Sequence, residues 1–169
     1  QQQRHSASLR KSALHDPLTG LANRAAFREA LEKVLTDPLQ RTQHALLFMD
    51  SDNFKQINDN WGHAAGDRAL KEIASRLLRF SARRYPTFRL GGDEFAMLVS
   101  DVTTDEQVQR LISQLGYLFV PPMPLRNGKA ISLSLSVGYA LVEPDSTSES
   151  LLEIADSSMY HNKKLRRGR

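Results

Sequence analysis

The feature that most constrains the fold is residues 88–99, where two short apolar segments flank a pair of glycines followed by two acids. Both Gly91 and Gly92 tolerate a positive φ, so the segment predicts a tight β-hairpin. Because neither glycine has a Cβ, a ligand can approach the backbone closely. Asp93 and Glu94 follow on the second strand, where alternation sends them to opposite faces, so that one carboxylate can reach a bound ion while the other holds the turn. The alternative is an ordinary surface hairpin with solvated acids.

The composition fits one domain of ordinary size. The chain has 169 residues, and 40% of them are hydrophobic, which is enough to build a core. It has no cysteine, which excludes disulfides and thiolate metal sites and suits a reducing compartment. No apolar run approaches the length of a membrane span, and no secretory leader is visible. The net charge of +4 favours anionic partners, but much of the excess lies in residues 163–169.

A continuous apolar run at residues 45–49 predicts a strand that is buried on both faces. It ends in Asp50-Ser51-Asp52, at the kind of position where α/β sheets place their chemistry and where hard divalent cations find oxygen ligands. We expect Asp50 to be the ligand because it follows the run directly. Asp52 is better explained as the N-cap of a short helix at residues 53–60.

Residues 54–67 are dense with polar side chains set between aromatic residues and glycines. Asn58 and Asp67 together offer an amide and a carboxylate that can read a guanine edge, because the carboxylate accepts from the N1 and N2 donors of the base. Lys55 would supply a point charge for phosphate. Each residue alone is more often a cap or a turn residue, but the combination favours a site. His63 is open to either interpretation, a site residue or a turn ahead of the next helix.

Periodicity predicts the remaining elements. Helices are expected at residues 24–36, 65–79, 105–119 and 148–165, the first with Asn23 as its N-cap. A second hairpin is expected over residues 125–142, turned by Asn127-Gly128. Its alternation predicts one buried face and one wetter face, formed respectively by Ile131, Leu133, Leu135 and Val137 and by Ser132, Ser134 and Ser136. Residues 1–14 are compatible with the end of a longer helix or with a frayed terminus.

This order of elements predicts an α/β sandwich with a mixed, largely antiparallel sheet flanked by helices. Asp50 and the acids behind the glycine pair could then lie side by side. Carboxylates on adjacent strands that clamp one or two Mg²⁺ ions against a triphosphate are what two-metal nucleotidyl transfer requires. The chain has no GxxxxGK[ST] loop, so the phosphates are not held as in P-loop enzymes.

Five segments, in order and at the right separations, resemble the motifs of the GGDEF family of diguanylate cyclases. They are DPLTGLANR at 16–24, DSDNFKQINDNWGHAAGD at 50–67, RLGGDEF at 89–95, SVGYA at 136–140 and ADSSMYHNKK at 155–164. The first three are similar in wording to inner-membrane members of the family. The resemblance implies condensation of two GTP molecules into cyclic di-GMP with release of pyrophosphate, on a fold related to the polymerase palm and the class III nucleotidyl cyclases. It assigns residues 15–169 to the catalytic domain.

The resemblance also implies roles for the acids. Asp50 and Asp93 would hold the divalent ions, Mg²⁺ or Mn²⁺, with the backbone carbonyl of Ser51. Ser51 stands where the family usually has an aliphatic residue, but only the carbonyl is needed, so metal binding is expected to survive. Asp93 would also take up the proton of the 3′-hydroxyl, whose pKa a metal lowers. Glu94 would support the second ion or the hairpin.

For the substrate, the resemblance implies that Lys55 stabilises phosphate and that Asn58 and Asp67 contact guanine. The residues expected to line the same site are Phe54, His63, Gly91 and Gly92. The family's last helix commonly ends in Lys, two residues, Gly and Arg. Here Lys163 is in place as an expected phosphate ligand, whereas Arg166 occupies the Gly slot and puts the role of Arg167 in doubt. These cations could instead merely complement the helix dipole.

Regulation and assembly are expected to follow the family with one departure. Many members carry Arg-x-x-Asp as a product-inhibition site, whereas residues 82–85 here are Ala-Arg-Arg-Tyr, so weak or no inhibition through that site is expected. One GTP per domain cannot close the ring, so a second copy must face the first, and N-terminal sensor modules with a helical stalk usually arrange this. We expect residues 1–14 to be the stump of the stalk, the fragment to be mostly monomeric and weakly active, and the domain to be the cytoplasmic part of an inner-membrane bacterial signalling protein.

Two other functions are compatible with parts of the sequence. A catalytically weak or inactive GTP-binding regulatory domain would keep Asn58 and Asp67 but usually loses an acid at position 50, 93 or 94, and all three acids are present. A nucleic-acid-binding module would explain the basic terminus. However, aromatic residues make up only 7% of the chain and are not interleaved with the basic ones, so no nucleic-acid partner is expected.

Overall fold

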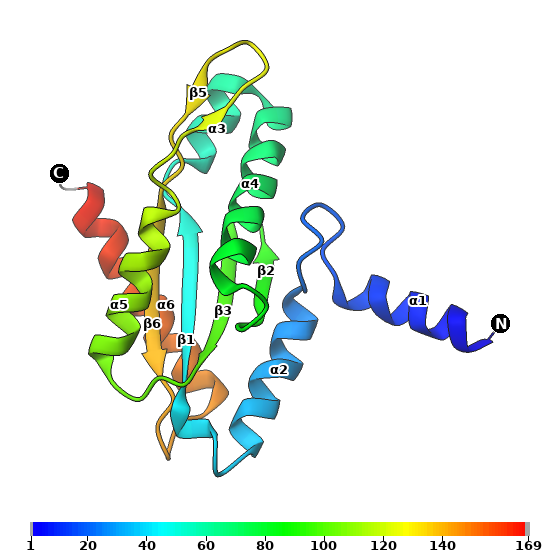
Figure 1. Cartoon of the computed structure of the whole chain (residues 1–169), viewed down its shortest axis with the longest axis vertical. Coiled ribbons are helices and arrows are strands. Elements are labelled where there is room, and N and C mark those ends of the chain that lie inside the picture. Colours follow the sequence, from blue (N-terminus) through cyan, green and yellow to red (C-terminus); the bar gives the residue numbers. More distant parts are fainter. Residues whose placement is uncertain (1, 168–169) are drawn as a thin grey trace.

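A four-stranded antiparallel sheet forms the middle layer of the molecule (Figure 1). The computed structural model describes residues 2–167, with the side chains of residues 10–12 and 167 left undescribed. The strand order is β2-β3-β1-β6, and each neighbouring pair is antiparallel. The strands are β1 (His44–Ser51), β2 (Thr87–Gly91), β3 (Glu94–Ser100) and β6 (Leu135–Leu141). The expected sheet is therefore confirmed, and its parallel element among the described residues is a single bridge between Ala22 and Phe88.

β1 is the centre of the sheet, because its apolar run is buried on both faces as expected. It pairs with β3 on one side and with β6 on the other. At its carboxyl end Asp50 stands opposite Glu94 on β3 and opposite Ser136 on β6. The end of β1 thus brings together residues from both neighbouring strands.

Helices cover both faces of the sheet and create two apolar cores. One core packs two helices on one face of the sheet against residues such as Leu46 and Phe88. The other packs the remaining helices against residues such as Leu47 and Met49. The helices of the first core are α2 (Arg24–Thr36) and α6 (Ser148–Arg167), and those of the second are α3 (Phe54–Trp61), α4 (His63–Ser81) and α5 (Asp105–Tyr117).

Local signals account for several helix ends. The side chain of Asn23 accepts a hydrogen bond from the backbone of Ala26, which confirms the predicted N-cap of α2. The helix α4 begins at His63, so this residue belongs to the first turn of the helix and not to a preceding turn. The helix α1 (Gln2–Leu14) extends away from the rest of the molecule in Figure 1, and a short 3₁₀ turn (Arg41–Gln43) precedes β1.

The helix α6 lies directly on β6 because Gly138 permits it. A Cβ at Gly138 would overlap the backbone nitrogen of Met159 and approach the carbonyl oxygen of Ala155 to 2.5 Å. Asn162 adds a hydrogen bond of 2.6 Å from its amide to the carbonyl of Val137. This close contact fixes the helix that carries the basic residues of the C-terminal segment.

The predicted hairpin over residues 88–99 is confirmed, with one correction. Gly91 pairs with Glu94, so Gly92 and Asp93 form the turn, and Asp93 does not lie on the strand. Both glycines have positive φ, 139° for Gly91 and 50° for Gly92. Asp93 is therefore presented by a turn whose geometry depends on glycine.

The expectation of a hairpin over residues 125–142 is wrong in part. The turn at Asn127-Gly128 joins only two-residue strands, β4 (Met123–Pro124) and β5 (Ala130–Ile131), which form a separate small sheet. The strand β6 pairs with β1 instead. The residues predicted to face inward are buried, but Ser136, predicted on the wetter face, is also fully buried. Its burial is tolerated because its hydroxyl donates a hydrogen bond to Asp52, as described below.

Candidate functional site

The predicted acids meet at the carboxyl end of β1. Asp50 is paired in register with Glu94, and Asp93 lies in the adjoining turn of the β2–β3 hairpin. Asp93 is close enough to Asp50 for its negative charge to raise the pKa of that carboxyl. The structure thus brings Asp50, Asp93 and Glu94 to one corner of the sheet, although Asp50 is far from the other two along the chain.

Asp50 is partly buried, and its two carboxylate oxygens lie in different surroundings. Its Oδ2 accepts a bond of 2.9 Å from the ammonium of Lys163. Its Oδ1 is buried and has no hydrogen-bond partner among the described residues. Burial is the largest influence on the pKa of Asp50 and raises it. Lys163 opposes that rise, whereas Asp93 and Asp52 add to it. A buried carboxylate oxygen without a partner is costly, so this site favours the arrival of a cation.

The donor set suits a hard divalent cation that completes its shell elsewhere. The part of the chain that the structure describes holds no group of three or more His, Cys, Asp or Glu residues that could bind a metal. Asp50 and Asp93 offer carboxylate oxygens, and the carbonyl of Ser51 lies beside them, within 3.3 Å of the Lys163 ammonium. Mg²⁺ usually takes one or two carboxylates from the protein and its other ligands from water and substrate phosphates. The residues therefore fit such an ion.

The predicted phosphate ligand Lys163 touches the predicted metal ligands. Its ammonium contacts both Asp50 and the carbonyl of Ser51. The Lys163 and Asp50 side chains are only 18% and 14% exposed, so this is a partly buried ion pair. The side chain of Arg167, the other predicted phosphate ligand, lies outside the described residues. In this structure the ammonium of Lys163 occupies the oxygens that the sequence assigns to a metal.

The hairpin turn is held in place by hydrogen bonds to its backbone. Arg89 donates from Nε and Nη2 to the carbonyl of Gly92, at 3.1 and 2.9 Å, and from Nη1 to Asp16 at 2.9 Å. Burial works against ionisation of Asp16, but its hydrogen bonds from Thr19 and the charge of Arg89 outweigh burial and lower its pKa. Glu94 is 53% exposed and 3.9 Å from Arg24. The motif around Asp16 therefore supports the turn that presents Asp93.

The prediction that Asp52 caps a helix is wrong. The N-cap of α3 is Asn53, which makes no side-chain cap bond. The carboxylate of Asp52 instead accepts hydrogen bonds from the hydroxyls of Ser134 and Ser136 and from the guanidinium of Arg166. This network was not predicted from the sequence. The signals that could have found it were the run of serines on an otherwise apolar strand and the arginine in the usual Gly slot.

The predicted guanine contacts lie on the neighbouring helix pair α3–α4. Asn58 is partly buried, and its side chain lies where a Cβ on Gly66 would be. Phe54 packs beside the same glycine, 3.3 Å from that position. Asp67 follows Gly66 directly and is exposed. The structure thus places Asn58, Phe54 and Asp67 around one glycine of α4, and it leaves His63 and Lys55 exposed on the same two helices.

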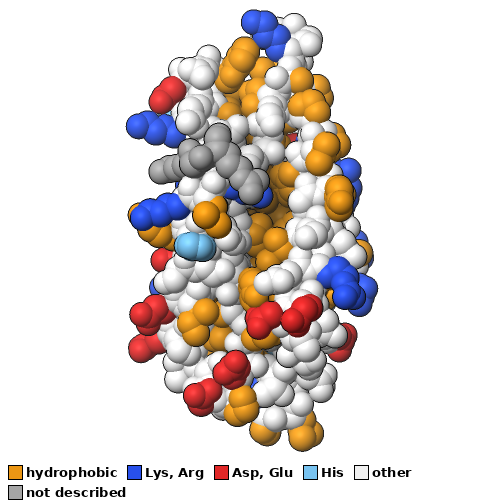
Figure 2. Space-filling view, turned by 90° about the vertical axis from the view of Figure 1, so that its left-hand side faces the viewer, with side chains coloured by type: hydrophobic (Ala, Val, Ile, Leu, Met, Phe, Trp, Pro, Cys, Tyr) orange, Lys and Arg blue, Asp and Glu red, His pale blue; other side chains and the backbone are white. Residues whose placement is uncertain are grey.

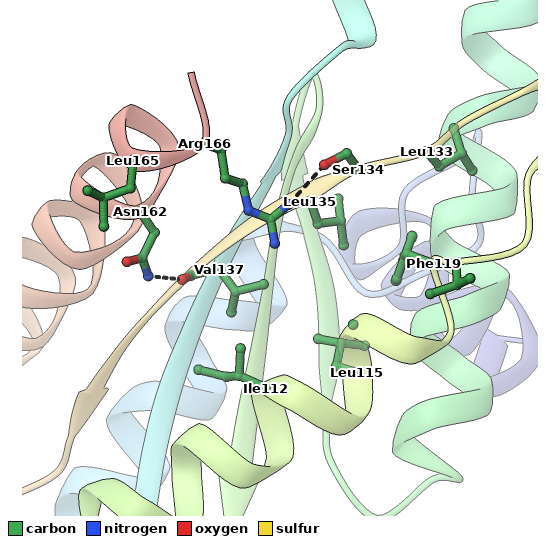
Figure 3. Close-up of a pocket in the computed structure, with 12 residues that line it drawn as sticks. Ile112, Leu115, Phe119, Leu133, Ser134, Leu135, Val137, Asn162, Leu165 and Arg166 are labelled. Atoms are coloured by element: carbon green, nitrogen blue, oxygen red, sulfur yellow. Dashed lines mark hydrogen bonds between the residues drawn. The ribbon is translucent and has the colours of Figure 1, made fainter. Parts of the chain in front are cut away.

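A groove of about 430 Å³ runs beside this site between α5 and α6. Figure 2 shows hydrophobic side chains along its floor, and the close-up in Figure 3 shows Ile112 and Leu115 of α5 facing β6, with Phe119, just after α5, near Leu133. Arg166 lies at its edge and bonds to Ser134. The groove shares only this edge with the acidic corner.

No helix among the described residues is long and apolar enough to cross a membrane.

Sequence comparisons find a family and several relatives that match nearly the whole chain. The family described as "Diguanylate cyclase, GGDEF domain" matches residues 13–169. The chain is 50% identical over 161 residues to diguanylate cyclase DgcN of Escherichia coli (strain K12), covering 95% of this chain and 40% of that protein. It is 42% identical over 168 residues to diguanylate cyclase TpbB of Pseudomonas aeruginosa (strain UCBPP-PA14), covering 98% of this chain and 39% of that protein. The chain thus spans well under half the length of these relatives.

Solved structures agree with the sequence comparisons. The GGDEF domain of TpbB (YfiN) from Pseudomonas aeruginosa matches with a TM-score of 0.81 and 40% identity, covering 87% of this chain and 92% of that chain. The coiled coil and GGDEF domain of DgcB from Caulobacter crescentus, in complex with c-di-GMP, matches with a TM-score of 0.88 and 29% identity, covering 96% of this chain and 86% of that chain. The predicted fold is confirmed, and so is the similarity to the YfiN (TpbB) type that the first three motifs indicated.

Proposed function

This chain belongs to the GGDEF domain family of diguanylate cyclases, and on that premise we propose that it condenses two molecules of GTP into cyclic di-GMP. Each 3′-hydroxyl oxygen forms a bond to the α-phosphorus of the other GTP, and each α-phosphorus loses pyrophosphate. The observation that carries the proposal is the meeting of Asp50 and Asp93 at the end of β1, beside the helix pair that holds Asn58. A carboxylate pair that can hold a divalent cation suits phosphoryl chemistry.

We propose that Asp50, Asp93 and the carbonyl of Ser51 hold the divalent cation, Mg²⁺ or Mn²⁺. The support is the partnerless buried Oδ1 of Asp50 and the charge of Asp93 felt at that carboxyl. When bound, the cation would neutralise phosphate charge and lower the pKa of the attacking hydroxyl. Glu94, half exposed at the start of β3, supports a second ion or the hairpin.

Asp93 is the proposed acceptor of the 3′-hydroxyl proton. Its carboxylate makes no hydrogen bond or ion pair with any other described residue, so its lone pairs are free for substrate. Lys55, exposed on α3, and Lys163, at the end of β1, are the proposed phosphate contacts. Gly91 and Gly92 leave the hairpin without side chains where a phosphate would approach the backbone.

Guanine recognition is proposed for Asn58 and Asp67. The Asn58 amide lies against Gly66, which leaves no room for a larger residue there and orients the amide next to the turn of α4 that carries Asp67. Phe54 packs at the same place and supplies apolar surface for the base. His63 opens α4 and lines the same side.

Ring closure needs two domains, so we propose that the chain acts as a homodimer within a longer protein. Residues 1–14 are proposed to be the end of a stalk from an N-terminal sensor region, because α1 leaves the rest of the molecule (Figure 1). The domain would face the cytoplasm on an inner-membrane protein. As a separate fragment it should be mostly monomeric and weakly active, and a stable dimer in light scattering at low micromolar concentration would contradict this.

Product inhibition through the usual family site is proposed to be weak or absent. Tyr85 stands in place of the acid, and its ring is buried beside Phe80. Ala82 stands in place of the arginine and has a left-handed backbone, with φ of 46°. We expect isothermal titration calorimetry to detect no binding of cyclic di-GMP at low micromolar concentration. Tight binding there would contradict the prediction.

The test of the proposed function is incubation of the chain with GTP and Mg²⁺, with and without an N-terminal dimerising fusion, followed by chromatography. Cyclic di-GMP and pyrophosphate should form, and the fusion should increase the rate. A dimeric fusion that binds GTP but leaves it unchanged would instead indicate the regulatory GTP-binding alternative.

A further inference from the structure

Arg166, near the end of α6, joins its helix to two other segments of the chain. In the structure its guanidinium reaches from the end of α6 to the segment that leads into β6 (Figure 3). Its Nη1 donates to Asp52 Oδ2 at 3.1 Å and to the hydroxyl of Ser134 at 2.9 Å. A glycine at this position could make neither bond.

Asp52 is the point where three segments are tied together. Its carboxylate accepts hydrogen bonds from Ser134, Ser136 and Arg166, and its backbone N–H donates to the carbonyl of Ser134 at 2.9 Å. The residue follows β1 directly, the serines belong to β6 and the segment before it, and the arginine belongs to α6. These bonds therefore fix the end of α6 relative to the end of β1.

Lys163 lies one helical turn before Arg166, so the two side chains leave the same face of α6. Lys163 contacts Asp50 and the Ser51 carbonyl, which are the residues just before Asp52. Asn162 anchors the helix on the other side of Lys163, through its bond to Val137. The lysine is thus held between two anchors, and Arg166 is the outer one.

We infer that Arg166 is a positioning residue for the reaction, because it fixes the last turn of α6 and so holds the Lys163 ammonium at the end of β1. The inference rests on the proposed function for the role of Lys163 toward phosphate. Preorganised charge at the site of phosphate binding lowers the cost of ordering that group when substrate arrives. Without Arg166 the helix end frays, and Lys163 reaches the substrate from a broader range of positions.

If Arg166 served only to stabilise the fold, its loss would lower the melting temperature. The side chain of Arg166 is 54% exposed, so its ion pair with Asp52 adds little to global stability. The body of α6 is already fixed by its contact with Gly138 and by buried residues such as Leu151 and Ala155. Loss of Arg166 should therefore change the end of α6 and substrate binding, and leave the melting temperature nearly unchanged.

The test compares R166A with wild type, with R166K and with K164A. Alanine keeps helix propensity, so the substitution removes the contacts without the flexibility of glycine. K164A removes a nearby positive charge that lies over Tyr160 and does not touch Asp52. The readouts are hydrogen exchange at residues 162–167 and the dissociation constant of the α,β-methylene analogue of GTP with Mg²⁺.

We expect R166A to weaken analogue binding about fivefold, as is usual for loss of a charge-assisted contact network, and to speed amide exchange at the end of α6. R166K should restore binding to within about twofold of wild type, since it keeps the charge opposite Asp52. K164A should match wild type in both readouts. Because Arg166 acts through Asp52, the two substitutions should not be additive. We expect the double variant R166A/D52N to bind the analogue as D52N alone does.

Unchanged analogue binding in R166A would overturn the inference, whether or not amide exchange increases. An equal loss in K164A would also overturn it, because the effect would then be general charge. If wild type itself binds no GTP analogue, the proposed function fails, while faster exchange in R166A would still establish the tie between Arg166 and Asp52.

Discussion

The two sides of the proposed cation site are built in opposite ways. At the junction of β1 with α6, the carboxylates of Asp50 and Asp52 are paired with Lys163 and Arg166. At the turn of the β2–β3 hairpin, Asp93 makes no bond to any described residue, and Glu94 is 3.9 Å from Arg24 at 53% exposure. The first side pairs both of its carboxylates closely, whereas on the second side Asp93 has no partner among the described residues and Glu94 has only a long, exposed ion pair.

The backbone of the β2–β3 hairpin, in contrast, is held by side chains from within and outside the hairpin. This explains why Asp93 is well placed although its carboxylate has no partner among the described residues. Arg89 binds the carbonyl of Gly92 twice and is itself held by Asp16, while Arg24 donates to the carbonyl of Leu90 at 3.2 Å. The hairpin is thus positioned by arginines that act on its main chain. A ligand meets one side that is ordered by ion pairs and another that is ordered without using its acids.

The largest effect is expected from D93N, which tests whether the unpaired carboxylate in the hairpin turn takes part in the reaction. The variant removes a proposed cation ligand and the proposed proton acceptor, so cyclic di-GMP formation should fall about 1,000-fold. The fold should persist, because Asp93 lies in a turn and has no internal partner among the described residues. Chromatography gives the rate and circular dichroism the fold. A folded D93N with more than about a tenth of wild-type activity would contradict the division.

Next in size is G138A, which tests whether α6 must lie directly on β6. The new Cβ would meet the backbone of Met159 and Ala155, and backbone cannot move aside as a side chain can. The free energy of unfolding should fall by about 3 kcal/mol in urea titrations. The matched control is G116A, since a Cβ at Gly116 of α5 meets no atom within 4 Å. Equal stability of G138A and wild type would show that the helix is held less closely than described.

A smaller effect is expected from K163M, which turns the paired side into an unpaired one. Asp50 would lose its ammonium partner, and the free energy of unfolding should fall by about 1–2 kcal/mol because a partly buried carboxylate is left unpaired. Mg²⁺ should then stabilise K163M more than wild type, because the cation no longer has to displace the ammonium from Asp50 and Ser51. Thermal unfolding with and without Mg²⁺ measures both effects, with K164M as control. Equal stabilisation of both proteins by Mg²⁺ would argue against shared oxygens.

The smallest effect concerns Asp16, which holds Arg89 and so supports the hairpin turn that carries Asp93. Its pKa is lowered in the folded protein, so its contribution to stability is present above the ordinary value of 3.8 and is lost as pH falls through the lower folded value. Between about pH 5 and pH 3 wild type should lose on the order of 0.5 kcal/mol more stability than D16N. Urea unfolding at each pH measures this difference. Parallel pH profiles for the two proteins would remove Asp16 from the support of the turn.

Local signals made much of the fold predictable. The strand at residues 45–49, the cap at Asn23 and the glycine turn follow from apolar runs and backbone preferences that act over a few residues. The position of Asp93 was missed because two residues must separate Gly91 from Glu94 for the strands to pair, and the pairing is not visible in the sequence.

The paired side of the site was much less predictable, because its contacts join distant segments. Asp52 bonds to Ser134, Ser136 and Arg166, which lie 82, 84 and 114 positions further along the chain. Which strand β6 would join was equally open, since alternation shows which face is buried and not which neighbour it pairs with. Only the folded structure shows that Lys163 rests on Asp50.

The most direct test of the account is a crystal structure with Mn²⁺ and the α,β-methylene analogue of GTP, in which anomalous scattering locates the metal. The account predicts a manganese ion bonded to a carboxylate oxygen of Asp50 and to one of Asp93, with Lys163 moved from Asp50 to a phosphate. A metal bonded to neither carboxylate, or a nucleotide bound with Lys163 still on Asp50, would contradict it.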